Sequence, residues 1–150
     1  MAVAGRAALL ALLALVAGAV LAACGGATGT VAQQVQSWAT STGWSATVSQ
    51  LRGDLSRLSV IDSDSPAARR TVCDVLTTDA LDANQQLPTP DNTFTSLLSH
   101  AYEDAATAGR ACFSGGARLD EAAPLAQSSA RSLVQAEARY DSLTSELPSS

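Results

Sequence analysis

The chain contains no lysine, and its nine basic residues, all arginines, are outnumbered by 14 acidic residues, which gives a net charge of −5. Proteins that bind nucleic acid need a basic face, so this composition predicts no nucleic-acid partner. The Gly-x-Ser-x-Gly, phosphate-loop and dinucleotide-binding patterns are also missing. The common hydrolase and nucleotide-dependent classes are therefore not indicated, and we expect no catalytic role and no cofactor.

His100 is the only histidine in the chain. A general base needs a nucleophile or a substrate proton within reach, and no residue pattern marks one beside His100. A solvated or hydrogen-bonded histidine on a helix is the simpler interpretation. A single histidine without free thiolates also excludes the usual zinc ligand sets.

Two groups of acidic residues could in principle bind a metal cation and are considered as candidate sites. The segment Asp62-Ser63-Asp64 resembles the start of a calcium loop, but a proline and an alanine stand where an oxygen ligand and a glycine are required. Helix capping explains these acids better. The other acids, Asp74, Asp79 and Asp82, share one predicted helix and are interpreted as a solvated face rather than a carboxylate cluster. We therefore predict no metal site.

The one long hydrophobic run covers residues 7–23 and follows a single charge at Arg6. It closes on Leu21-Ala22-Ala23-Cys24, which is typical of a lipobox, where a bacterial secretory signal is cleaved and the cysteine is lipidated. We predict a lipoprotein signal peptide over residues 1–23, a lipid on Cys24 and a lipidated tether over residues 24–30. The protein would then be held on the extracytoplasmic face of the cell membrane. An uncleaved anchor is the alternative, although a spanning helix needs about 20 apolar residues.

Cys73 and Cys112 remain once Cys24 carries the lipid. An even pair outside the cytoplasm predicts a disulfide, with a redox or metal-binding pair as the alternative. Helical spacing places Cys112 about 31 Å from the start of its helix and Cys73 about 17 Å from the end of its own. A disulfide tolerates Cα atoms at most about 7 Å apart. The linker from Gln85 to Pro90 must therefore run on along the helix axis before the chain turns back.

Apolar residues at steps of three and four predict a helical domain over residues 31–147. A short first helix carries Val31, Val35 and Trp38 and ends or bends at Gly43. The second has the clearest stripe, which suits near-parallel packing in a bundle: Trp44, Val48, Leu51, Leu55 and Leu58. The polar residues between them are expected to face away from the core: Arg52, Asp54, Ser56 and Arg57.

Capping residues followed by proline mark the next two helices. Ser65 before Pro66 starts the third helix, and Thr89 before Pro90 starts the fourth. The third is expected to end near Leu87 and to bury Val72, Val75, Leu76, Ala80 and Ala83. The fourth ends at a glycine pair and is expected to bury Phe94, Leu98, Ala101, Ala105, Ala108 and Cys112.

The last helix either starts at Pro124 or is kinked there, because proline disfavours helix at the residue before it. Its apolar side is predicted to contain Ala126, Ala130, Leu133, Tyr140, Leu143 and Leu147. No segment alternates at period two, so we expect no sheet. Short connections favour antiparallel neighbours. The predicted fold is all-α: an antiparallel bundle of four main helices plus a short N-terminal helix, with one disulfide.

The order of these features resembles small secreted or lipid-anchored helical proteins of high-GC Gram-positive bacteria. The residues that carry the resemblance extend over most of the domain: Trp38, Gly43, Asp54-Leu55, Leu58, Cys73, Pro88-Thr89-Pro90-Asp91, Ala101, Ala105, Cys112 and Gly115. The resemblance implies a helical lipoprotein of the cell envelope. It implies no activity and assigns no functional residue.

Two functions are compatible with these features. The first is a structural or partner-binding module that displays a helical face at the membrane and binds an envelope protein. The second is a carrier of a small apolar ligand, with Trp38, Trp44, Phe94 and Tyr102 lining a cavity, although such aromatics usually belong to the core. A cavity of a few hundred Å³ between helices favours the carrier. An exposed apolar patch over a filled core favours the partner-binding module.

Overall fold

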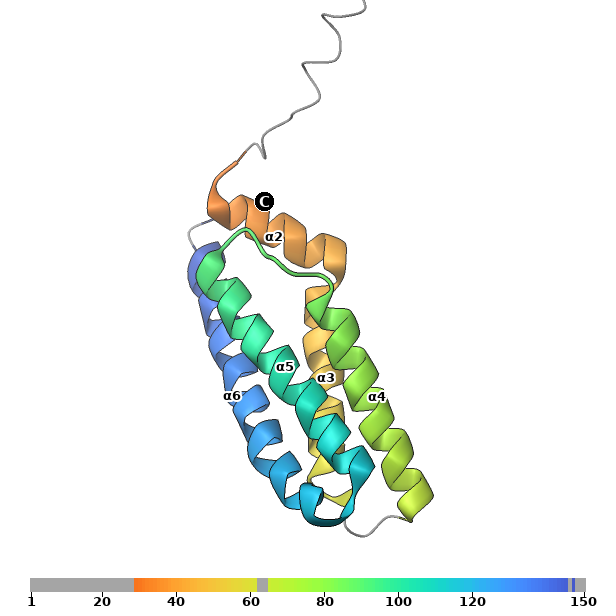
Figure 1. The fold of residues 1–150 in the computed structure, drawn as a ribbon. Coiled ribbons are helices and arrows are strands. Elements are labelled where there is room, and N and C mark those ends of the chain that lie inside the picture. The colour runs from red at the N-terminus through yellow and green to blue at the C-terminus, as the bar shows by residue number, and fades with distance from the viewer. Residues whose placement is uncertain (1–28, 62–64, 146, 148–150) are drawn as a thin grey trace, which may run out of the picture.

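The computed structural model describes residues 29–61, 65–145 and 147. Its helices are α2 (Val31–Thr42), α3 (Trp44–Leu58), α4 (Pro66–Asn84), α5 (Asn92–Ser114) and α6 (Leu119–Thr144), with a 3₁₀ turn, η2 (Gly116–Arg118), before α6. The four long helices α3 to α6 form an antiparallel bundle, and α2 crosses one end of it (Figure 1). The described ranges contain no strand. The predicted all-α bundle is confirmed.

Gly43 separates α2 from α3 as predicted. Its φ of 66° places it in the left-handed region, where a glycine is favoured over residues with a Cβ atom. Its backbone N–H donates to the carbonyl oxygens of Ala39 and Thr40, which closes α2. The chain therefore turns sharply and enters the bundle through α3.

The stripe on α3 is confirmed, because Trp44, Val48, Leu51, Leu55 and Leu58 are all buried. The prediction that Asp54 faces away from the core is wrong, because only 3% of Asp54 is exposed. Asp54 follows Leu51 by three positions, so it lies at the edge of the buried stripe. That edge is covered by α4, where Asp79 is its neighbour.

Helix α4 begins at Pro66 with Ser65 as its cap, and the Ser65 hydroxyl accepts a hydrogen bond from the Ala68 N–H at 3.2 Å. The helix ends at Asn84, before the predicted end near Leu87. Val75 is 39% exposed, so the prediction that it is buried is wrong. The buried face follows Cys73, Leu76, Ala80 and Ala83, and Val75 lies about 200° around the helix from Cys73.

Helix α5 begins two residues later than predicted. Asp91, and not Thr89, caps it, and the Asp91 carboxylate accepts a hydrogen bond from the Phe94 N–H at 2.7 Å. The hydroxyl of the buried Thr89 instead contacts the backbone of Asp91 and the hydroxyl of Thr95. The predicted apolar face is confirmed in full, and Gly115 ends the helix.

The disulfide joins Cys73 of α4 to Cys112 of α5, with their Cα atoms 5.7 Å apart. From the disulfide, α5 extends about 14 Å further than α4 toward the end covered by α2. The linker from Gln85 to Asp91 spans this difference and lies beside α2 (Figure 1). The indole N–H of Trp38 holds it there by donating to the Gln86 carbonyl at 3.1 Å. The predicted disulfide and the extended path of the linker are therefore confirmed.

Helix α6 begins at Leu119 and runs through Pro124, so a fresh start at Pro124 is wrong. Leu133 and Ala136 are fully buried, whereas Leu147 lies beyond the helix end. Ser129 is also fully buried, and its hydroxyl donates to the carbonyl oxygen of Ala101 on α5 at 2.8 Å. The buried residues of the described chain lie between Val35 and Ala136, so a chain that starts at Gly29 carries this core.

Candidate functional site

A groove of about 550 Å³ lies between α3 and α6. It is formed by the C-terminal half of α3, the turn that follows and the N-terminal half of α6. Its apolar wall consists of Leu55, Leu58, Ile61, Leu119, Ala122 and Ala126. Pockets of a few hundred Å³ with mainly apolar walls are typical of sites for small ligands.

The groove exists because α6 presents small residues opposite the leucines of α3. Ala122, Ala126 and Ala130 recur every four residues and line the same hollow. Helices pack 8–10 Å apart depending on the side chains between them, and alanine fills little of that distance. Leu55, Leu58 and Ile61 are each at most 7% exposed, so they form the floor of the groove and not its outer surface.

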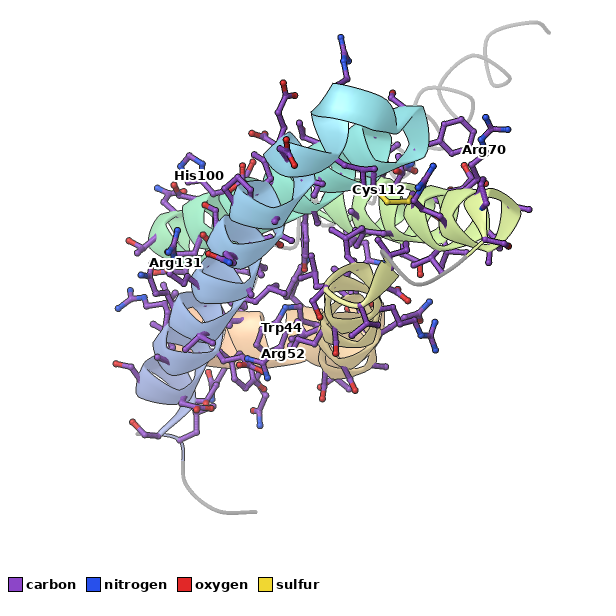
Figure 2. All side chains as sticks on the ribbon, turned by 90° about the horizontal axis from the view of Figure 1, so that it is seen from below. Trp44, Arg52, Arg70, His100, Cys112 and Arg131 are labelled. Atoms are coloured by element: carbon purple, nitrogen blue, oxygen red, sulfur yellow. A yellow bond between two sulfur atoms is a disulfide. The ribbon has the colours of Figure 1, made fainter. Side chains whose placement is uncertain are left out.

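The rim of the groove is polar. It contains Arg52, Ser56 and Ser59 from the α3 side, and Asp120 and Gln127 from α6. Arg52 forms an ion pair across the gap with Glu137 of α6, and both side chains remain partly exposed. In Figure 2, Arg52 and Trp44 are seen between the ribbons of α3 and α6. Arg52 therefore marks one end of the groove.

A second hollow of about 580 Å³ lies on the same side of the bundle, where α2, α3 and α6 meet. Trp44 and Tyr140 contribute aromatic rings whose centroids are 4.8 Å apart. Glu137 and Asp141 contribute two carboxylates from successive turns of α6. The lining of this hollow includes no arginine, so its own charge is negative.

Only one of the four aromatic residues proposed to line a cavity does so. Trp44 borders the second hollow, whereas Trp38, Phe94 and Tyr102 line neither of the two hollows. Trp38 and Trp44 both meet the Phe94 ring edge-on, with centroids 5.7 Å and 5.1 Å from it. Burial raises the pKa of Tyr102 to about 12, which keeps its hydroxyl neutral. Phe94 and Tyr102 therefore belong to the core and the partly buried Trp38 packs against it, as the simpler interpretation held.

The polar residues considered from the sequence are not brought together. His100 is exposed on α5 and borders neither hollow (Figure 2). Asp74 and Asp82 are exposed, but Asp79 is partly buried and accepts a hydrogen bond from Gln50 Nε2 at 2.6 Å. The acidic face of α4 is therefore solvated except at Asp79. The segment 62–64 lies outside the described residues.

Asp54 and Asp79 place two carboxyl groups between α3 and α4, which the sequence analysis missed. Burial raises the pKa of Asp54, and the neighbouring Asp79 carboxyl adds to the effect, while the Arg57 guanidinium opposes it. Arg57 Nη1 is 3.2 Å from Asp54 Oδ1. The spacing of Asp54 from Leu51 was the available signal, but the position was assigned to the polar face because its side chain is charged.

Within residues 29–61, 65–145 and 147, no three His, Cys, Asp or Glu side chains are arranged to hold a metal ion. No helix in the same ranges is long and apolar enough to cross a membrane. Comparisons with protein-family models, with curated proteins and with solved structures found no match. The groove and the acidic hollow are therefore interpreted from their own chemistry.

Proposed function

We propose that this chain is a non-catalytic lipoprotein of the cell envelope that holds a small, largely apolar ligand in the groove between α3 and α6. The observation that carries the proposal is the groove itself, with its leucine and isoleucine floor and its alanine wall. Burial of an aliphatic ligand against this surface removes apolar area from water, at about 25 cal/mol per Å².

The distribution of exposed apolar residues supports the ligand over a protein partner. Partner-binding faces gather such residues in one patch. Here the large ones are distributed over four helices and the turn after α3: Val31 on α2, Val60 in the turn, Val75 and Leu81 on α4, Phe113 on α5 and Val134 on α6. A protein partner therefore stays the second hypothesis.

The anchor rests on the sequence Leu21-Ala22-Ala23-Cys24. Helix α2, which follows the predicted tether in the sequence, crosses one end of the bundle, while the C-terminal end of α3 and the N-terminal end of α6, which line the groove, lie at the other end (Figure 1). Helix α3 is about 22 Å long, so an anchored bundle would hold the groove well away from the lipid surface. The ligand would then enter from the aqueous side of the membrane.

The anchor is tested by Cys24→Ala, with Ala27→Ser as the matched control in the tether. The control should incorporate labelled palmitate and sediment with membranes. Cys24→Ala should lose the label and either leave the membrane or remain as an unprocessed precursor. Undiminished labelling of Cys24→Ala would show that Cys24 is not the lipid acceptor.

The groove is tested by native mass spectrometry of the full chain extracted from its host membranes. Ala126→Phe places a ring in the groove, and Ala138→Phe places the same ring on an exposed position of α6 outside it. The parent protein and Ala138→Phe should carry a co-purified apolar molecule, and Ala126→Phe should not. Equal amounts of bound molecule in both variants would place the ligand elsewhere.

A further inference from the structure

The groove and the acidic hollow lie next to each other along the line of contact between α3 and α6, which we call the seam. Arg52 lines the groove, Glu137 lines the hollow, and the two side chains are ion-paired. Along α3, Leu58 lies about 9 Å from Arg52 in one direction, and Ser45 lies about 10 Å from it in the other. The seam between α3 and α6 thus has an apolar half and an acidic, aromatic half on either side of one ion pair.

The acidic half has the chemistry that recognises an organic cation. Glu137 and Asp141 supply negative charge, and Trp44 and Tyr140 supply aromatic rings, which attract cations through their electron-rich faces. Arg52 does not line the hollow and is connected to it through its ion pair with Glu137. Asp141 is exposed and borders the hollow without taking part in that pair.

The Arg52–Glu137 pair does not block passage between the two halves. The side chains are 42% and 34% exposed. Exposed ion pairs of this kind contribute little to stability and exchange readily with water or another charge. A ligand that lies along the seam could therefore displace the pair.

We infer that the ligand is an amphiphile with one aliphatic chain and a positively charged head group. This inference rests on the proposed function, because the chain occupies the groove. The ammonium group lies in the hollow between the Asp141 and Glu137 carboxylates and the rings of Trp44 and Tyr140. The length of the seam, about 20 Å from Leu58 to Ser45, accommodates a chain and a head group in succession.

The test compares two single-chain probes below their micelle concentrations, using isothermal titration calorimetry on the chain from Gly29 onward. Dodecyltrimethylammonium carries a positive head group and dodecyl maltoside a neutral one. The cationic probe should bind at least about tenfold more tightly, and raising the salt concentration should reduce this preference. Ala126→Phe, and Ala123→Phe from the rim as a second blocking variant, should abolish binding of both probes.

Substitution of the carboxylates separates the head-group site from the groove. Asp141→Asn leaves the Arg52–Glu137 pair intact and should weaken the cationic probe severalfold without changing the neutral one. Glu121→Gln removes an acid of α6 that borders neither hollow and should change neither affinity. Equal affinities for the two probes would overturn the cationic head group while leaving the groove in place. Failure of both probes to bind would overturn the proposed function itself.

Discussion

The guanidinium of Arg139 donates two hydrogen bonds to the carboxylate of Asp91, from Nε to Oδ1 at 3.1 Å and from Nη2 to Oδ2 at 2.7 Å. The same carboxylate accepts the Phe94 N–H and caps α5. Asp91 therefore fixes the start of α5 and ties it to α6 across 48 residues of sequence. The Arg139 hydrogen bond is the main reason that the pKa of Asp91 lies below its ordinary value of 3.8.

Asp91→Ala should lower the free energy of unfolding by about 2 kcal/mol, because it removes both a helix cap and a charge-assisted pair. Asp91→Asn keeps a good capping residue and should lose less. Because the folded-state pKa is depressed, the stability from the carboxylate is present above the ordinary value and is lost as the pH falls through the depressed one. Urea unfolding at several pH values tests this, with the exposed Asp74→Asn as a control. A pH-independent difference between Asp91→Asn and the parent would contradict the ion pair.

Asp54→Asn should change the free energy of unfolding in the opposite direction, so that the variant is more stable than the parent protein. Burial raises the pKa of Asp54, so the ionised carboxylate disfavours the fold at neutral pH. Stability from protonated Asp54 is fully present below its ordinary pKa and is lost as the pH rises through the raised one. The asparagine variant should therefore be more stable at neutral pH, on the order of 1 kcal/mol, and this advantage should shrink in acid. A loss of stability at neutral pH would show that the Arg57 contact outweighs desolvation.

Because α4 and α5 approach closely at Gly109, replacing this glycine by alanine should affect stability differently from the same replacement at Gly53. A Cβ atom at Gly109 would lie 2.3 Å from Thr77 Oγ1 and 2.8 Å from the Cys73 carbonyl oxygen, whereas one at Gly53 meets nothing within 4 Å. Gly109→Ala should cost about 1–3 kcal/mol, because the Cys73 backbone beside the disulfide has to shift. Gly53→Ala should stabilise α3 by about 0.5–1 kcal/mol. Similar melting temperatures for the two variants would contradict this packing.

The fold could be predicted from the sequence where burial and periodicity agree. All the apolar positions predicted to be buried on α3 and α5 are buried, so the spacing of these residues is sufficient to predict which face of each helix turns toward the core. Asp54 and Val75 show the limit, because a charged residue is buried by its neighbour α4 and an apolar residue lies on the exposed side. The burial of Asp54 and the exposure of Val75 both depend on where the neighbouring helices lie, and the sequence of one helix does not show this.

The start of α5 was misplaced by two residues for a related reason. Thr89 and Asp91 are both capping residues, and only the structure shows that Arg139 from α6 holds Asp91 in the capping position.

The candidate site could not be predicted in the same way. Leu55 and Leu58 were correctly expected in the core, but the empty space beside them depends on the alanines of α6 that happen to lie opposite. The spacing of Ala122, Ala126 and Ala130 at every fourth position is visible in the sequence. The sequence does not show that these alanines face α3, because that depends on how the helices are arranged in the bundle.

Ile61 provides the most direct test of the groove, because it is the only isoleucine in the chain, it is 3% exposed and it lines the groove. Selective labelling of the isoleucine δ1 methyl group gives an NMR spectrum with one protein signal, which can be followed as dodecyl maltoside is added below its micelle concentration. We expect this signal to shift and saturate. In a second sample labelled at the leucine and valine methyl groups, the signals of Leu55 and Leu58 should shift as well, while those of Leu98 and Leu133 in the bundle core stay unchanged. An Ile61 signal that does not move at saturating probe, or shifts confined to exposed residues such as Val75 and Val134, would contradict the account.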